Sequence, residues 1–419
     1  MRIINSTSTR AVAALLDRRP GRDPLVQRRV ATIVDRVRRD GDRALLAYAR
    51  KFDGLNGPME ISRRSIDESA DQVAPEVRRA IQIAARNIRR VAARQRPRPW
   101  TVSPAPGVSI SQRVLPLDRV GCYVPGGRYP LPSSLLMTAL PARAAGVAEV
   151  IVVCPKPDAT VLYAALEAGV TRLFRIGGAH AVAALAYGTS TIPRVDRIVG
   201  PGNAYVAAAK AYVAPDCAID FFAGPSEIAV LWSKGNAAWI AADLIAQAEH
   251  DPQARAILVT PSKRLAEAVE RSVREQCPTE GPARQALATS GGIVLTQSLD
   301  EAVSLMQRLA PEHAVCESDA VASRLTRAGT VFVGRYSAQA SGDYVTGSNH
   351  VLPTAGAAAA RGGLSTADFV RVSTVQRITS AGLERIGPAG IALAEAEGLK
   401  AHAESLRIRL IPTGAKRRR

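Results

Sequence analysis

The stretch EVIVVCPKPDATVLYAALEAGVTRLFRIGGAHAVAALAY, residues 149–187, decides the fold class. It begins with a β-branched run, passes through a proline-rich turn into an alanine-rich helical segment, and then repeats the pattern with a Gly-Gly turn. Strand, tight turn and helix in alternation are typical of βαβ units, which place parallel strands side by side. The sequence therefore predicts an α/β protein built on parallel sheets.

The same alternation extends beyond this stretch in both directions. It covers residues 114–230, and a second set of strands and helices follows up to residue 333. Helical periodicity also runs through residues 25–50 and 75–96, upstream of the first set. We therefore predict two α/β domains, with the early helices joining one of them. The glycine- and alanine-rich residues 355–363 predict a hinge to a small helical C-terminal piece.

The composition excludes several classes of protein. The chain has 419 residues, 22% of them charged and 47% hydrophobic, which suits two or more domains and excludes disorder. No apolar run reaches the roughly 18 residues that a transmembrane helix needs. The N-terminus lacks the apolar stretch of a signal peptide, so we expect a cytoplasmic protein without a membrane partner. The five cysteines lie far apart without a CxxC pair, which argues against a disulfide framework or a zinc knuckle.

The net charge of +18 raises the question of a nucleic-acid partner. Only seven of the 55 basic residues are lysines, and the chain is alanine-rich, a pairing typical of GC-rich coding sequence. Aromatic residues make up 4% of the chain, too few for the stacking platforms of proteins that bind RNA or single strands. We therefore expect no nucleic-acid partner, and we interpret the basic residues 412–419 as a solvated tail.

Three glycine turns separate a predicted strand from a predicted helix, at residues 126–127, 177–178 and 200–202. Backbone N–H groups at such turns can face a phosphate. A glycine can equally close a tight connection without any ligand, so each turn alone is compatible with both roles. Three turns in one α/β domain favour a nucleotide only weakly, because the GxGxxG and P-loop motifs are absent.

Polar residues around the histidines suggest a metal site. Gln247 and His250 are three residues apart at the end of a predicted helix, so both can point to one face. Asp343 lies between two glycines in a segment suited to a site loop. A His/Asp set with an amide oxygen matches the ligands of a catalytic zinc ion. Taken singly, each histidine is more often a hydrogen-bonded structural residue, and spacing alone does not bring these residues together.

Several motifs nevertheless resemble one family over nearly the whole chain. They are GCYVPGG (121–127), GPGNAYV (200–206), AGPSEI (223–228), DLIAQAEHDP (243–252), PEH (311–313), GDYVTGSNHVLPT (342–354) and EGLKAH (397–402). In this order they resemble the histidinol dehydrogenases. The resemblance implies an oxidoreductase of histidine biosynthesis that catalyses its last step with one Zn²⁺ per subunit. The enzyme would oxidise L-histidinol to L-histidine with two NAD⁺, through L-histidinaldehyde.

The resemblance also implies an architecture of two incomplete Rossmann-like parallel-sheet domains, a small helical C-terminal domain and an N-terminal arm. We assign the arm to residues 1–19 and the C-terminal dimerisation domain to residues 363–411. We assign the first Rossmann-like domain to residues 20–113 together with 228–362, and the second, NAD-binding domain to residues 114–227. The implied assembly is a homodimer with shared active sites.

Matched motif by motif, the resemblance implies roles for individual residues. The implied zinc ligands are Gln247, His250, Asp343 and His402. The implied proton-transfer pair is Glu312 and His313. The implied substrate contacts are Ser226, Gln247, His250, His313, Asp343, His350, Glu397 and His402. The implied NAD contacts are Tyr123, His180 and Asn203.

Two positions depart from the family pattern. His180 stands where relatives commonly have Gln, which puts the NAD contact there in question. Arg128-Tyr129 is shared with relatives that oxidise other primary alcohols, such as sulfopropanediol dehydrogenases, and these are the alternative function. Asp343 and Glu397 are acidic residues expected around the cationic amine of histidinol, and they favour histidinol.

Overall fold

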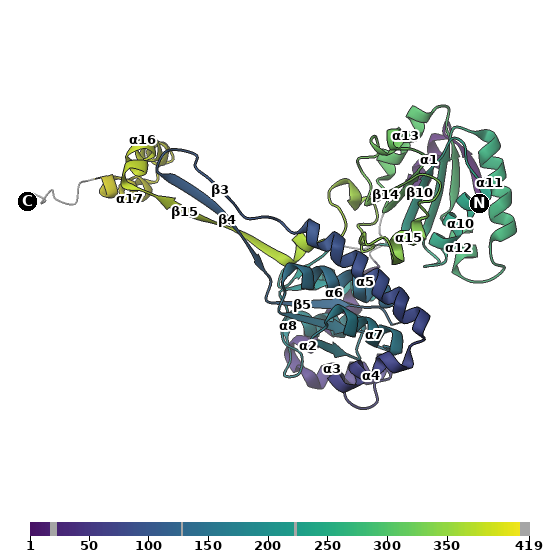
Figure 1. The fold of residues 1–419 in the computed structure, drawn as a ribbon, viewed down its shortest axis with the longest axis horizontal. Helices are drawn as coiled ribbons and strands as arrows, with labels where there is room; N and C mark the ends of the chain where they lie inside the picture. The colour runs from purple at the N-terminus through teal and green to yellow at the C-terminus, as the bar shows by residue number, and fades with distance from the viewer. Residues whose placement is uncertain (17–22, 127–128, 222–223, 411–419) are drawn as a thin grey trace, which may run out of the picture. The chain divides into compact units, whose positions relative to one another are not determined.

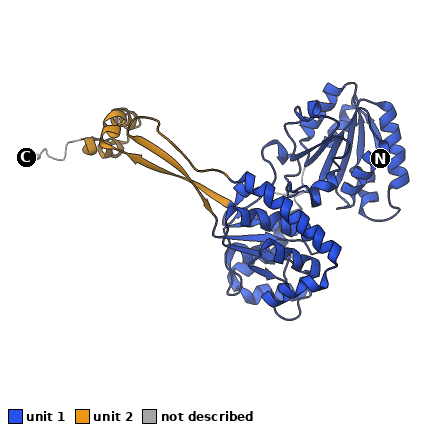
Figure 2. Ribbon diagram, in the orientation of Figure 1, with its two compact units in different colours: residues 1–96, 117–369 blue, residues 97–116, 370–419 orange. Residues whose placement is uncertain are grey.

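The computed structural model describes residues 1–16, 23–126, 129–221 and 224–410 (Figure 1). They form two compact units (Figure 2). Unit 1 contains residues 1–96 and 117–369, and unit 2 contains residues 97–116 and those that follow 369. The basic residues 412–419 and Arg128 lie outside the described residues.

Unit 1 contains two six-stranded sheets, which we call sheet I and sheet II. Sheet I has the order β2-β7-β6-β5-β8-β9. Its strands are β2 (Glu60–Ile61), β5 (Arg119–Tyr123), β6 (Glu149–Val153), β7 (Arg172–Phe174), β8 (Arg197–Val199) and β9 (Ala218–Ile219). All neighbours are parallel except β2 and β7. The chain passes to one side of β5 with β6 and to the other with β8, and such a switch point opens a crevice at the carboxyl ends of the strands.

Helices cover sheet I in two groups (Figure 1). One group contains α2 (Pro24–Asp40), α3 (Asp42–Tyr48), α8 (Gly178–Tyr187) and α9 (Ala204–Val213). The other contains α4 (Arg63–Glu68), α5 (Pro75–Gln95), α6 (Pro132–Ala145) and α7 (Ala159–Ala168).

The assignment of residues 20–113 to the same domain as 228–362 is wrong. The apolar stripe of α2, with Val30, Val34 and Val37, shares one core with α8, α9 and sheet I. Strand β2 also pairs with β7 of sheet I. The periodicity of α2 specifies a buried face but not the sheet that buries it, because any alanine-rich surface of suitable shape can accept a stripe of valines.

Sheet II is parallel throughout and has the order β1-β12-β11-β10-β13-β14. Its strands are β1 (Arg2–Asn5), β10 (Glu227–Leu231), β11 (Arg255–Thr260), β12 (Gly292–Leu295), β13 (His313–Cys316) and β14 (Thr330–Val333). The helices around it are α1 (Thr9–Leu16), α10 (Ala237–Ala248), α11 (Lys263–Gln276), α12 (Pro282–Thr289), α13 (Leu299–Leu309), α14 (Asp319–Ala322) and α15 (Gln339–Tyr344). The predicted N-terminal arm therefore contributes an edge strand to this sheet, beside β12.

Unit 2 is a three-stranded antiparallel sheet with two helices. Strand β4 (Val108–Pro116) pairs with β3 (Trp100–Val102) on one side and with β15 (Val370–Ile378) on the other. Helices α16 (Ser380–Ala396) and α17 (Lys400–Leu410) follow and pack on each other.

The predicted start of the C-terminal domain is also wrong in part. Residues 97–113 join the C-terminal piece, because β4 pairs with β15 along its whole length. The units separate after Phe369 rather than at a hinge in residues 355–363. Phe369 and Thr366 are buried, and the Thr366 hydroxyl donates to the carbonyl of Ala92 within unit 1.

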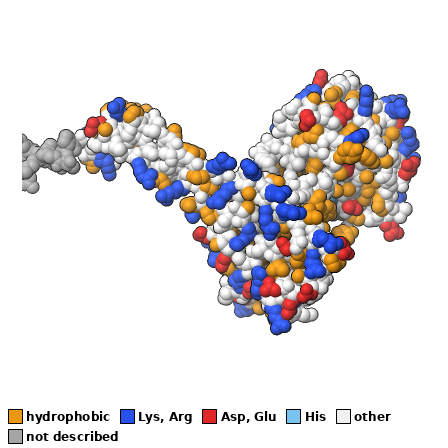
Figure 3. All heavy atoms as spheres, in the orientation of Figure 1, with side chains coloured by type: hydrophobic (Ala, Val, Ile, Leu, Met, Phe, Trp, Pro, Cys, Tyr) orange, Lys and Arg blue, Asp and Glu red, His pale blue; other side chains and the backbone are white. Residues whose placement is uncertain are grey.

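In the described part of the chain, no helix is long and apolar enough to cross a membrane. Lys and Arg side chains on the face drawn in Figure 3 are interspersed with acidic ones. All five cysteines are free thiols, and four of them are buried.

Candidate active site

An open cleft of about 2990 Å³ is lined by residues from both sheets of unit 1. Sheet I contributes the ends of β5 and β8 through Tyr123 and the glycine turn 200–202. Sheet II contributes Glu312 and His313, which lie where β13 begins. The carboxyl ends of sheet I and the amino end of a central strand of sheet II thus line one cavity.

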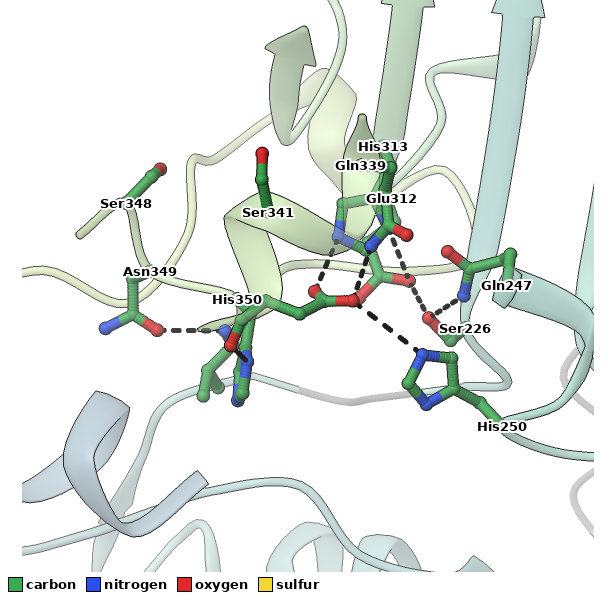
Figure 4. A network of polar contacts seen from close by, with 12 residues as sticks. Ser226, Gln247, His250, Glu312, His313, Gln339, Ser341, Ser348, Asn349 and His350 are labelled. Atoms are coloured by element: carbon green, nitrogen blue, oxygen red, sulfur yellow. Dashed lines mark hydrogen bonds and ion pairs between the residues drawn. The ribbon is translucent and has the colours of Figure 1, made fainter. Parts of the chain in front are cut away.

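The polar cluster of Figure 4 is built on the beginnings of β10 and β13. Ser226 immediately precedes β10, and Glu312 immediately precedes β13. His313 pairs in register with Ile228 of β10. Ala310, at the end of α13, has a φ of +37°, and Pro311 follows it, so the chain enters β13 through an irregular turn. The sequence pattern predicts neither β10 nor β13, because both are short and begin in polar segments.

Glu312 is held by the neighbouring strand. Its Oε2 accepts hydrogen bonds from the Ser226 hydroxyl at 2.6 Å and from the Glu227 N–H at 2.8 Å. Burial raises the pKa of Glu312 to about 8, against the lowering effect of these two hydrogen bonds. The side chain can therefore exist as a neutral acid or as a carboxylate near neutral pH.

His313 is buried with a fixed ring orientation. Its Nδ1 lies 3.2 Å from the carbonyl oxygen of Glu227, which only accepts, so Nδ1 carries the proton. Its Nε2 is then a free base, 3.8 Å from Oδ1 of Asp343. Burial lowers the pKa of His313 to about 4, so the ring is neutral at physiological pH.

Asp343 lies between three histidines. His250 Nε2 is 3.8 Å from its Oδ2, and interaction with this carboxylate raises the pKa of His250. Burial alone would raise the pKa of Asp343, but the histidines and a neighbouring amide hold it below its ordinary value. His350 donates from Nδ1 to the Asp343 carbonyl at 2.9 Å, and burial lowers the pKa of His350.

Gln247 completes this part of the cluster. Its Nε2 donates to the Ser226 hydroxyl at 2.5 Å, while its Oε1 is buried without a hydrogen-bond partner among the described residues. No three His, Cys, Asp or Glu side chains within the described ranges form a group that could hold a metal ion. Gln247 is not one of these four residue types, however, and its amide oxygen can also bind a metal ion. An orphaned Oε1 three residues before His250 in the chain fits a cation, because an unpaired buried acceptor is costly.

The three predicted NAD contacts all line the cleft, and all make internal hydrogen bonds. The Tyr123 hydroxyl accepts from the Gly178 N–H at 3.0 Å. The Asn203 side chain caps α9 by accepting from the N–H groups of Tyr205 and Val206. Buried His180 lies with Nε2 2.8 Å from Oδ2 of Asp53.

Two functional candidates were missed from the sequence. Asp53 also accepts from the Gly177 N–H at 3.0 Å, so it anchors the start of α8 together with His180. Asp53 ends a π-helix, Ala49–Asp53, and no sequence pattern there indicates a contact with residues 177–180. Gln339 donates to Asp343 within the cluster of Figure 4 and lies one helical turn before it, a spacing that could have identified it.

Two predicted site residues lie in unit 2. Glu397 ends α16, and His402 lies on α17. Both side chains are exposed. Tyr129, the described half of the Arg128-Tyr129 pair, is exposed and lines the cleft.

Known proteins match the chain over nearly its whole length. The family model of histidinol dehydrogenase matches residues 16–410. The histidinol dehydrogenase of Rhizobium meliloti (strain 1021) is 46% identical over 395 residues, 91% of each chain. That of Caulobacter vibrioides is 45% identical over 415 residues, 96% of this chain and 97% of the relative. The crystal structure of histidinol dehydrogenase from Elizabethkingia anophelis has a TM-score of 0.93 at 32% identity and covers 98% of both chains. The chain belongs to the histidinol dehydrogenase family.

Proposed function

We propose that this protein oxidises L-histidinol to L-histidine in two NAD-dependent steps, with L-histidinaldehyde between them. The observation that carries the proposal is the Glu312–His313 pair. The two residues are adjacent, buried and hydrogen-bonded to the same strand, yet the pKa of one is raised to about 8 and that of the other is lowered to about 4. Environments that push two pKa values apart are typical of an acid–base pair.

His313 performs the proton transfer in both oxidations. Its neutral Nε2 accepts the proton of the alcohol oxygen as the hydride leaves the alcohol carbon for NAD⁺. Glu312, as the carboxylate, then takes a proton from the water that adds to the aldehyde carbon, while His313 returns its proton to the aldehyde oxygen and becomes neutral again. His313 accepts the hydroxyl proton of this hydrate while the second hydride leaves for a second NAD⁺. Two NADH and one carboxylic acid result.

A zinc ion fits the donor set beside this pair. Gln247 Oε1, His250 Nε2 and the Asp343 carboxylate would hold it in unit 1, and His402 of unit 2 would be the fourth ligand. The bound metal would serve as a template that holds the imidazole and the amine of the substrate. The carboxylates of Asp343 and Glu397 would attract the cationic amine of the substrate. Ser226 and His350 would complete the substrate contacts.

The cofactor would bind at the carboxyl ends of β5 and β8. Tyr123, His180 and Asn203 line this part of the cleft, together with the turn at residues 200–202. Because His180 is already paired with Asp53, its proposed contact with NAD is through the ring face rather than through Nε2.

We further propose that the active form is a homodimer in which His402 and Glu397 serve the site of the partner. Unit 2 exposes large apolar side chains on both its sheet and its helices, and a second copy would cover them. They are Trp100, Val102, Leu115, Val372, Ile378, Leu393, Leu399 and Ile408.

A substrate panel tests the proposed function. Purified protein with zinc and NAD⁺ is expected to form NADH with L-histidinol and not with 2,3-dihydroxypropanesulfonate (sulfopropanediol). A chelator is expected to abolish this activity, and added zinc to restore it. Turnover of the sulfonate alone would assign the protein to the alternative function.

A further inference from the structure

Gln339 is a buried amide with no role in the mechanism above. It begins helix α15 and is 1% exposed. Its Nε2 donates a hydrogen bond of 2.7 Å to Oδ2 of Asp343, one helical turn further along. The same oxygen of Asp343 faces His250, and the other faces His313. Gln339 therefore touches the carboxylate that links a proposed metal ligand to the proposed base.

The hydrogen bond to Asp343 determines which end of the Gln339 amide faces the carboxylate. A carboxylate oxygen such as Oδ2 of Asp343, which also faces Nε2 of His250, accepts hydrogen bonds. The atom that faces Oδ2 at 2.7 Å must therefore be the NH₂ group. Its Oε1 is buried, and no residue that the structure describes gives it a hydrogen bond.

Gln247 shows the same arrangement. It uses Nε2 on the Ser226 hydroxyl and leaves its own buried Oε1 unpaired. In Figure 4 the amide oxygens of Gln339 and Gln247 point toward one another. Two unpaired acceptors next to an anion destabilise the unliganded site, and a cation that enters relieves this cost.

We infer that Gln339 is a positioning residue of the proposed metal centre. Its amide nitrogen holds the Asp343 carboxylate in the orientation that serves the metal, and its amide oxygen adds to the negative potential that receives the cation. Hydrogen-bond partners of ligating carboxylates orient them in this way. The inference rests on the proposed zinc site and adds a residue to it.

The test compares metal affinity in the wild type and in Gln339→Met. Methionine keeps the length and approximate volume but can neither donate to Asp343 nor supply the amide oxygen. In competition with a chelator of known affinity, we expect the variant to hold zinc about tenfold or more weakly. Gln307→Met is the matched control. Gln307 also donates through its amide, to Arg324 and Thr326, but outside the site, and this variant is expected to keep wild-type affinity.

Cobalt(II) in place of zinc gives a second readout that does not depend on activity. The visible absorption of the bound cobalt reports its ligand geometry, so the spectrum of Gln339→Met is expected to shift while NAD affinity stays unchanged. If Gln339→Met does not fold, Gln339→Leu serves instead, because a shorter apolar side chain likewise can neither donate to Asp343 nor supply the amide oxygen.

The outcomes separate this inference from the proposed function. Wild-type zinc affinity and an unchanged cobalt spectrum in a folded Gln339 variant would overturn the role of Gln339 and leave the zinc site intact. Failure of the wild-type protein to bind zinc or cobalt would overturn the zinc site itself, and the inference with it.

Discussion

At the scale of single residues, the site depends on one irregular turn. Adjacent residues of a regular strand point to opposite faces. Nevertheless, Oε2 of Glu312 lies 3.7 Å from Nδ1 of His313. The reason is that Ala310, with its positive φ, and Pro311 form an irregular turn that places Glu312 just before β13 begins. The sequence predicts that these two residues need an irregular element to share a site, since proline bars the helix from continuing. The burial that separates their pKa values is a property of the folded sheet and has no signature in the sequence.

Replacing Glu312 by Gln separates the two oxidation steps. The amide keeps the size and can still hydrogen-bond to Ser226, but it cannot take a proton from water. General bases contribute roughly 10²–10⁴-fold to rates, so we expect about a hundredfold loss in the aldehyde step with bound zinc unchanged. Single-turnover oxidation of histidinaldehyde, with metal analysis of the same sample, measures both. A normal aldehyde rate in this variant would remove Glu312 from the mechanism.

The raised pKa of Glu312 predicts how the aldehyde step depends on pH. Only the carboxylate is a base, and with a pKa of about 8 it is mostly protonated below that pH. The rate of histidinaldehyde oxidation is therefore expected to rise about tenfold per pH unit below pH 8 and to level off above it. A pH series on the wild type and on Glu312→Gln checks this, because the variant should lack the rise. A flat wild-type profile from pH 6 to 9 would contradict the assignment.

At the scale of elements, local sequence patterns predict where helices and strands lie in the chain better than they predict which of them pack together. The bounds of α7, α9 and α10 follow from alanine-rich segments between a cap and a glycine or a turn, because these signals are local. The partner of α2 depends on which sheet presents a complementary surface, and residues 24–96 were consequently assigned to the wrong domain. The pairing of β4 with β15 joins residues more than 250 positions apart, which no local pattern specifies.

The glycine turn between β8 and α9 offers a test at this scale. Gly200 has a φ of +112°, and a Cβ there would lie 2.1 Å from the carbonyl oxygen of Tyr123. Gly200→Ala must therefore displace the turn or β5, and we expect NAD affinity to fall at least tenfold. Gly281→Ala is the control, because Gly281 has a φ of +98° but nothing within 4 Å of its Cβ position. Both variants carry the backbone strain of a positive φ, about 1–3 kcal/mol each, and only the first carries the clash. Equal NAD affinity in the two, measured by titration, would show that the turn does not shape the cofactor site.

At the scale of the whole molecule, the site described in unit 1 contains Gln247, His250 and Asp343 but not His402. The fourth proposed ligand lies on α17 of unit 2, beyond β15, whose antiparallel partner β4 was predicted to belong to the two Rossmann-like domains. Whether His402 serves its own chain or a partner depends on the assembly, which a single sequence does not encode in any local pattern.

A mixing experiment tests the shared site. His313→Asn and His402→Asn are each expected to be inactive alone. After random exchange of equal amounts, about half of the dimers are mixed, and each mixed dimer has one site without a lesion if sites are shared. About a quarter of wild-type activity should then return. No recovery, with exchange confirmed by differently tagged subunits, would mean that His402 acts within its own chain.

The central claim is that one site carries out both oxidations. It is tested most directly by counting the NADH formed for each L-histidinol consumed, with the product identified by chromatography. We predict two NADH per histidinol and L-histidine as the product, with no accumulation of aldehyde at saturating NAD⁺. A ratio of one, with histidinaldehyde as the product, would contradict the claim.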